Sequence, residues 1–418
     1  MDTFPDFYKT TEQTYVELKR HKAKSDVDMD IQSHNQDGVV VLSVKYSRAE
    51  SDSVNNLRFK SKSLEPSDDE KRPKEKIMFL FGEHAREFVS VEAALRLSAA
   101  LTNHDEDEEL NELGREVLET YDVVSIPVAN PLGRAKAESG EFCYRDNANG
   151  VDLNRNWDSH WDGSMSAGNT NSGSEPFSES ETKILRDVMT ETNPHIFMTV
   201  HSGTLGMYTP FAYSTSIPTG PEESEMLSMI LSLDEESCQC PMGAAGKEVG
   251  YLCPGTCLDY AYDVLKVPYA FAFEIYGNEE ERAKCKAAFE KQKMRFKSEG
   301  SYMKDFVSFL EMETTHSCFL QDRMETSTQH LSRMSEEECF SFFNPTSESE
   351  LRDVTGNWVR VFLKLALKVR ETNSKGGSSS SSSSGAEVRS STSSTTTTHI
   401  SASIDEEMGL HIVGSKII

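Results

Sequence analysis

The stretch that most constrains the fold runs from Lys76 to Glu87 and reads KIMFLFGEHARE. Its first part is a short, continuous apolar run that ends at Gly82, a pattern typical of a strand buried on both faces of an α/β sheet. Ligands and catalytic groups in such sheets gather just beyond the carboxyl ends of the strands. We therefore predict that the polar residues directly after this run, His84 and Glu87 among them, lie at a functional site.

His84 and Glu87 are three residues apart, so one metal ion can take both side chains. Imidazole and carboxylate suit zinc, and a catalytic zinc commonly takes two histidines and one glutamate, which leaves a position for water. His201 offers the second histidine, because it ends another apolar run, HIFMTVH. The alternative is coincidence, since 11 His and 69 acidic residues produce such pairs by chance. Three ligands at strand ends nevertheless predict one Zn²⁺ ion held by His84, Glu87 and His201.

The composition limits the classes of partner. The chain has 418 residues, enough for one large domain or two small ones, and its formal net charge is −26. Such a charge opposes binding to nucleic acid or to an anionic membrane surface. A run of about 18 apolar residues is absent, so no membrane span is expected. The first twenty residues lack the apolar segment of a signal peptide.

The cysteines are even in number and clustered, with seven of the eight after residue 237. This distribution predicts disulfide bonds and a protein that is secreted or resides in the endomembrane lumen, although the pairing does not follow from sequence. The alternatives are free thiols or a zinc site made of cysteines alone. The spacings in Cys238-x-Cys240 and Cys253-x3-Cys257 fit such a zinc site only loosely.

Strand patterns alternate with helical patterns along the chain, which predicts an α/β fold with a parallel or mixed sheet and helices on both faces. The expected strands are residues 39–46, 77–81, 196–200 and 269–275, together with a strand and turn at residues 122–131. The expected helices are residues 11–24, 89–101, 179–191, 222–233 and 341–370.

Two segments depart from this pattern. Residues 280–337 are rich in Lys, Glu, Met and Phe without Pro, which predicts a helical insertion. Residues 373–418 are dominated by Ser and Thr, and such a tract buries too little apolar surface to fold. We therefore predict a catalytic domain at residues 1–372 that contains the insertion, followed by a disordered tail at residues 373–418.

Two further segments carry groups suited to catalysis. Asn154 and Arg155, in VDLNRNW, offer hydrogen-bond donors that suit a carboxylate, which the planar guanidinium can bind through two bonds. Glu274 is a carboxylate on the otherwise apolar strand YAFAFEI. Burial raises the pKa of a carboxyl group and suits it to act as a general base. The alternative for Glu274 is a structural ion pair.

The segments HARE, NRNW, VHSG, GYLCPGTCLDY and FEIYG, in this order, resemble the zinc metallocarboxypeptidases of the pancreatic A/B type. The resemblance covers roughly residues 7–372, apart from the insertion. It implies an α/β/α sandwich with a central mixed sheet of eight strands. It also implies an exopeptidase that acts on peptide or protein C-termini. We expect the protein to be a monomer.

Matched residue by residue, the resemblance implies a role for each site residue. His84, Glu87 and His201 match the zinc ligands, and Glu274 matches the catalytic base. Arg145 matches the arginine that stabilises the oxyanion. The remaining matches concern substrate binding: Asn154 and Arg155 for the terminal carboxylate, Tyr251 for the mobile tyrosine that closes over it, Arg86 for an outer subsite and Leu258 for the base of the specificity pocket.

An apolar residue at the position of Leu258 implies a preference for apolar or aromatic C-terminal residues. Small residues at Ala212, Gly246 and Ala272 would leave room above it. Two other functions stay open: a catalytically inactive peptide-binding protein on the same fold, and a zinc deacylase or deglutamylase. Acidic tails would be repelled by a chain of charge −26 unless the pocket held a local cation.

Overall fold

The computed structural model describes residues 4–48, 74–166, 170–219, 221–234, 238, 240–249, 251–277, 283, 286–287 and 333–377. Residues Met1–Ser374 form one compact unit, and Lys375–Ile418 form a second. Most of the predicted insertion at residues 280–337 lies outside the described ranges. The predicted tail at residues 373–418 lies outside them from residue 378 on. Both therefore stay predictions.

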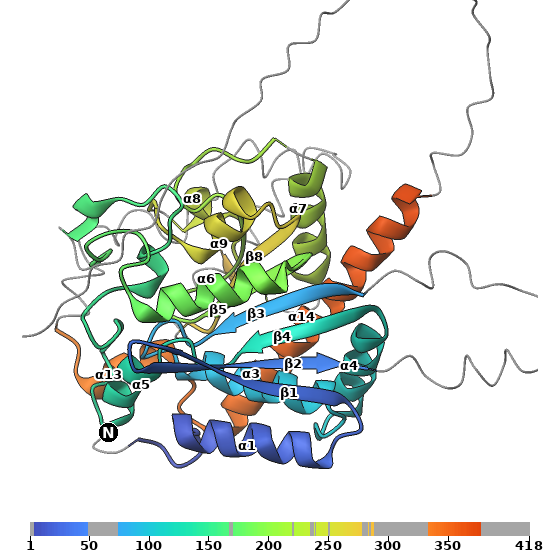
Figure 1. Ribbon diagram of the computed structural model, residues 1–418, viewed down its shortest axis with the longest axis horizontal. Coiled ribbons are helices and arrows are strands. Elements are labelled where there is room, and N and C mark those ends of the chain that lie inside the picture. The colour runs from blue at the N-terminus through green and yellow to red at the C-terminus, as the bar shows by residue number, and fades with distance from the viewer. Residues whose placement is uncertain are drawn as a thin grey trace, which may run out of the picture. The chain divides into compact units, whose positions relative to one another are not determined.

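Eight strands form one mixed sheet with the order β1-β2-β4-β3-β5-β8-β6-β7, as predicted (Figure 1). The four central strands, β4, β3, β5 and β8, run parallel to one another. The flanking pairs β1–β2, β2–β4 and β6–β8 are antiparallel, and β7 runs parallel to β6. The strands are β1 (Asp28–Gln36), β2 (Val39–Ser47), β3 (Glu75–Phe81), β4 (Tyr121–Ile126), β5 (Ile196–His201), β6 (Leu205–Thr209), β7 (Met242–Ala244) and β8 (Tyr269–Ile275).

Helices and short helical turns connect the strands and cover the sheet. The helices are α1 (Thr11–Lys24), α3 (Phe88–Leu101), α4 (Glu108–Thr120), α5 (Pro131–Glu138), α6 (Ser180–Thr192), α7 (Pro221–Asp234), α8 (Ala245–Glu248), α9 (Cys257–Asp259), α13 (Glu336–Phe343) and α14 (Glu348–Gly377). The short turns are η2 (Leu153–Arg155), η3 (Gly163–Ser166) and η4 (Tyr260–Val264). Among the residues that the structure describes, no helix combines the length and the apolar character that crossing a membrane requires.

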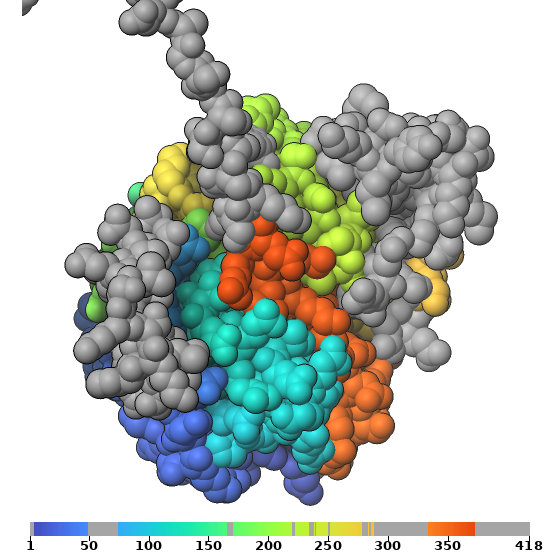
Figure 2. Space-filling view, turned by 90° about the vertical axis from the view of Figure 1, so that its right-hand side faces the viewer, coloured from blue at the N-terminus to red at the C-terminus, as the bar shows by residue number. Residues whose placement is uncertain are grey.

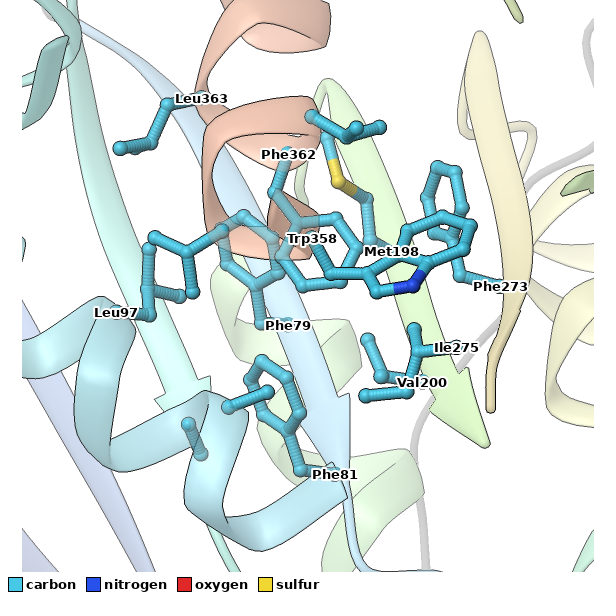
Figure 3. Close-up of a cluster of buried hydrophobic side chains, with 14 of the residues drawn as sticks. Phe79, Phe81, Leu97, Met198, Val200, Phe273, Ile275, Trp358, Phe362 and Leu363 are labelled. Atoms are coloured by element: carbon cyan, nitrogen blue, oxygen red, sulfur yellow. The ribbon is translucent and has the colours of Figure 1, made fainter. Parts of the chain in front are cut away.

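The sheet has an apolar cluster on each face because side chains alternate along every strand. On one face, Phe79 of β3 and Phe273 of β8 pack against Phe362 of α14 (Figure 3). On the other face, Met78 and Phe197 belong to a cluster that includes side chains of α6 and α9. Burial on both faces explains why the central strands are continuous apolar runs.

The predicted helix at residues 341–370 is two helices in the structure. Asn344 separates α13 from α14 and is extended, with φ −143° and ψ 141°. Pro345 follows, and a proline disfavours helical geometry in the residue before it. The apolar stripe of α14 was predicted correctly, since Trp358 and Phe362 are buried.

Ion pairs join the outer surface of α14 to α4. Arg360 Nη2 lies 2.6 Å from Asp107 Oδ2, and Arg360 Nε lies 3.0 Å from Glu109 Oε2. Figure 2 shows α14, in orange, beside the cyan helix α4 on the surface of the molecule. The last long helix is thus fixed by its apolar face on the sheet and by its charged face on α4.

Candidate metal and substrate site

The residues of the candidate site lie at or just after the ends of three neighbouring parallel strands. β3 ends at Phe81 just before the segment that holds His84 and Glu87, whereas His201 ends β5 and Glu274 lies near the end of β8. Because β3, β5 and β8 are adjacent and parallel, these groups meet at one edge of the sheet. Gly82 makes the tight exit from β3 with φ +66°, and a Cβ there would lie 2.9 Å from Val91 Cγ2.

The structure brings the three predicted metal ligands together. His84 Nδ1 lies 2.7 Å from Glu87 Oε1 and 3.1 Å from His201 Nδ1, and His201 Nδ1 lies 3.2 Å from Glu87 Oε2. All three side chains are buried, and one ligand atom from each lies within 4.8 Å of the others. Two imidazole nitrogens and a carboxylate facing one point are a donor set that fits zinc.

Asp152, which the sequence analysis missed, holds the far side of His84. Its Oδ1 lies 3.2 Å from His84 Nε2, and its Oδ2 accepts a hydrogen bond from Arg145 Nε at 2.8 Å. Burial opposes ionisation of Asp152, but Arg145 and His84 outweigh it and hold the pKa well below its usual range. A carboxylate on the second nitrogen of a metal-binding histidine fixes the ring and its tautomer. The signal available in sequence was an acid two residues before Asn154.

Glu274 is a half-buried carboxylate beside the candidate metal ligands, and its Oε2 atom is buried. Burial, reinforced by the charge of Glu87, raises the pKa of Glu274 to about 7, against the opposing effect of His201. Its Oε2 makes no hydrogen bond within the described part of the chain. A carboxyl group with a pKa near neutrality can take up and release a proton at physiological pH.

Two further predicted residues lie next to the candidate ligands, and a third contacts one of these two. Asn154 Nδ2 is 3.4 Å from His201 Nε2, and Arg145 Nη1 is 3.7 Å from Glu87 Oε1. Arg155 is buried, and its Nη1 donates to the carbonyl oxygen of Asn154 at 2.6 Å. These contacts put the guanidinium of Arg145 and the amide of Asn154 beside the candidate ligands, with the guanidinium of Arg155 next to Asn154, and all three groups are donors that suit a carboxylate.

Tyr251 and Arg86 differ in their exposure to solvent. Tyr251 is 47% exposed, and its predicted closing motion stays a prediction. Arg86 is buried: its Nη1 donates to the carbonyl oxygen of Cys143 at 3.1 Å, and its guanidinium lies 4.0 Å from the centre of the Phe343 ring. Arg86 therefore links the ligand segment to α13, and its predicted role in an outer subsite stays a prediction.

Leu258 lies in the apolar cluster that also contains Ala212 and Ala272. It is 2% exposed. Its neighbour Asp259 is buried, and its carboxylate accepts hydrogen bonds from the backbone N–H groups of Ala212 and Tyr213 at 2.9 Å each. The surroundings of Leu258 are thus apolar, and the adjacent acid is already engaged.

Two disulfide bonds confirm the predicted oxidised cysteines. Cys143 pairs with Cys339, and Cys238 pairs with Cys240, while Cys253 and Cys257 are free and buried. The pairing of Cys238 with Cys240 removes these two residues as ligands of an all-cysteine zinc site. The first bond fixes the loop that carries Arg145 to α13.

Known proteins resemble this chain in sequence and in fold. A family profile described as zinc carboxypeptidase matches residues 30–296. Carboxypeptidase A2 of Mus musculus is 30% identical over 219 residues, which cover 46% of this chain and 49% of that protein. Carboxypeptidase B2 of Bos taurus is 29% identical over 230 residues, covering 51% and 53%. The chain thus spans about half the length of the curated relatives it matches.

Other matches show how far the likeness extends. An inactive metallocarboxypeptidase, ECM14 of Arthroderma otae, is 26% identical over 235 residues, covering 46% of this chain and 39% of that protein. Bovine thrombin-activatable fibrinolysis inhibitor, solved in complex with tick carboxypeptidase inhibitor, has the same fold with a TM-score of 0.57. It is 19% identical and covers 87% of this chain and 98% of its own. Since the family profile spans more than half of the residues, the chain belongs to the zinc carboxypeptidase family.

Proposed function

We propose that the protein is an active zinc carboxypeptidase that hydrolyses the C-terminal peptide bond of peptides or proteins. The observation that carries this proposal is the convergence of His84, Glu87 and His201, with Glu274 beside them on the same face of the sheet. Zinc bound by these three side chains would polarise the scissile carbonyl and acidify a bound water.

The protein's own residues would transfer the proton, stabilise the oxyanion and bind the substrate carboxylate. Glu274 accepts a proton from the attacking water and later delivers it to the leaving amine, which its raised pKa suits. Arg145, held by Asp152, points N–H donors toward the oxyanion that develops. Asn154 and Arg155 grip the free terminal carboxylate, and Tyr251 closes over it, so that only chain ends are cut.

We further propose that the enzyme prefers apolar or aromatic C-terminal residues. Leu258, Ala212 and Ala272 supply apolar surface, and burying a methylene gains about 0.8 kcal/mol. A substrate ammonium or guanidinium would need an anion in this pocket. The nearest acid, Asp259, is bound by two backbone N–H groups and is not free for that purpose.

The second candidate is a catalytically inactive peptide-binding protein, because some relatives carry the name inactive metallocarboxypeptidase. The complete set of ligands together with Glu274 favours an enzyme. A deglutamylase is disfavoured by the apolar environment of Leu258. The two disulfide bonds support a secreted or lumenal location, where thiols are oxidised. We also propose that the protein acts as a monomer.

A direct experiment separates these functions. Release of a free amino acid is measured from blocked dipeptides that end in Phe, Leu, Arg or Glu, with and without a chelator. The proposal requires chelator-sensitive release that depends on Glu274. Binding of the same dipeptides without release, in a zinc-loaded sample, would indicate the inactive alternative. Fastest release from the dipeptide that ends in Glu would indicate a deglutamylase.

A further inference from the structure

The second ring nitrogen of His201 faces a buried polar cluster behind the metal ligands. While Nδ1 points to His84 and Glu87, Nε2 lies 2.9 Å from Thr199 Oγ1, 3.4 Å from Asn154 Nδ2 and 3.6 Å from Glu83 Oε2. The distance to Thr199 is that of a hydrogen bond, whereas the distance to Glu83 is that of a close charge contact. The imidazole of His201 therefore has the candidate metal ligands on one side and a hydroxyl, an amide nitrogen and a carboxylate on the other.

Glu83 is a buried carboxylate just after an apolar strand. It is 1% exposed, directly after Gly82, where the chain leaves an apolar strand. Trp157 Nε1 donates to its Oε1 at 3.0 Å, and the Cys257 thiol lies 3.5 Å from its Oε2. Among the described residues, no lysine or arginine forms an ion pair with it. Burying a carboxylate is costly unless a positive or strongly polar partner compensates, and the ring of His201 offers such a partner.

We propose that Glu83 is a positioning residue for His201. This inference rests on the proposed metal site. Its carboxylate, together with the Thr199 hydroxyl, favours the tautomer of His201 that carries its proton on Nε2 and leaves the lone pair of Nδ1 for the metal. Asp152 does the same for His84 from the other side. Each metal-binding histidine is thus backed by its own buried carboxylate.

The same side chains also define the competing interpretation. Ligand atoms of Glu83, His201 and Cys257 lie within 4.8 Å of one another, close enough to hold a metal ion themselves. In that case Glu83 would be a ligand of a second ion. A second ion there would also need Nε2 of His201 without its proton, which the contact with the Glu83 carboxylate disfavours.

The test compares substitutions of Glu83 with a matched control. Glu83→Gln keeps the shape and an acceptor for Trp157 but removes the charge, and Glu83→Met removes both at similar volume. Trp157→Phe removes the other partner of Glu83 and leaves the charge opposite His201. Zinc affinity and stoichiometry are measured by competition with a chromogenic chelator. The Nε2–H resonance of His201 is followed by NMR of ¹⁵N-histidine-labelled protein, and thermal unfolding is measured on the metal-free proteins.

We expect both Glu83 variants to bind one zinc about 10- to 100-fold more weakly and to shift the His201 Nε2–H resonance. Metal-free Glu83→Gln should unfold at or above the wild-type temperature, because a buried charge is gone and Trp157 keeps an acceptor. Metal-free Glu83→Met should unfold at a lower temperature than Glu83→Gln, because the buried Trp157 N–H loses its acceptor. Trp157→Phe should keep the zinc affinity. Wild-type zinc affinity in both Glu83 variants overturns the proposal. It is also overturned if the wild-type protein binds two zinc ions and Glu83→Gln binds only one. If the Glu83 variants and His201→Ala all keep wild-type zinc binding, the proposed metal site is wrong. If the Glu83 variants keep it and His201→Ala loses it, the metal site stands and only the role of Glu83 is wrong.

Discussion

His201 and Glu274 are register partners on the adjacent parallel strands β5 and β8. Their side chains therefore lie on the same face of the sheet, and Gly206 of β6 pairs with Glu274 from the other side. The Tyr208 side chain occupies the space that a side chain at Gly206 would take. The relative position of a metal ligand and the proposed base is thus set by backbone hydrogen bonds between strands, which are far more rigid than a loop.

The first prediction concerns the metal. His201→Ala should lose most of its bound zinc while the fold is kept, because it removes one of three protein ligands. Metal analysis after dialysis and circular dichroism measure the two properties. His34→Ala is the control: His34 lies on the edge strand β1 and contacts Ser43. Full zinc occupancy in the His201 variant would contradict the ligand assignment.

The second prediction concerns the base. Glu274→Gln should retain zinc and substrate binding, while kcat falls by about 10²-fold or more because no group takes the proton of water. Glu92→Gln is a matched control, since burial also raises the pKa of Glu92 to about 7, but its Oε1 accepts from the backbone of Lys9. Near-normal turnover in the Glu274 variant would remove Glu274 from the mechanism.

The third prediction follows from the sign of the shift at Glu274. A general base works only when ionised, so kcat/KM should fall as the pH drops through the pKa of this group, which lies at about 7 in the metal-free protein. A bound dication favours the carboxylate, so the midpoint in the zinc enzyme should lie below that value. The measurement is a pH profile of kcat/KM between pH 5 and 9. A profile that stays flat down to pH 5, or an acid limb unchanged in Glu274→Gln, speaks against this assignment.

The fourth prediction concerns specificity. The wild type should cleave a blocked dipeptide that ends in Phe faster than its Arg counterpart, by on the order of tenfold to a hundredfold in kcat/KM. Leu258→Asp should reverse this order, because it places an acid in the apolar cluster, and Leu258→Met should preserve it. Equal or faster cleavage of the Arg substrate by the wild type would show that the pocket lies elsewhere.

The fifth prediction concerns the Cys143–Cys339 bond. Its cysteines are 196 positions apart, so removing the bond as Cys143→Ser with Cys339→Ser should lower the free energy of unfolding by about 2–5 kcal/mol. Because Arg145 is two residues from Cys143, kcat should fall as well. The Cys238–Cys240 bond closes a separation of two and is the control, with a much smaller effect. Equal losses in both variants would contradict the loop-entropy explanation.

The candidate site was predictable where it depends on strands. Continuous apolar runs revealed β3, β5 and β8, and the groups at their ends meet because parallel strands finish at one edge. The roles of Arg145, Tyr251 and Leu258 came from resemblance alone. Their positions depend on loops whose course is not encoded in a periodic pattern.

Contacts between distant segments were not predictable. Asp152 reaches His84 across 68 positions, and Glu83 meets Trp157 across 74. The chain has 69 acidic residues, and no local sequence pattern distinguishes Asp152 and Glu83 from the exposed ones. The same holds for Arg86, whose stacking on Phe343 joins segments that only the folded chain brings together. Disulfide pairing likewise depends on the distance between cysteines in space.

The Cys143–Cys339 bond has a consequence for proteolysis. It forms a covalent ring that includes β5 and β8. A protease that cut the chain once between Gly277 and Arg333 would therefore produce two polypeptides that stay joined through sulfur. The larger would hold His84, His201 and Glu274, and the smaller would keep Phe362 against the sheet. A nicked, two-chain form of the protein would appear as one species on a non-reducing gel and as two after reduction.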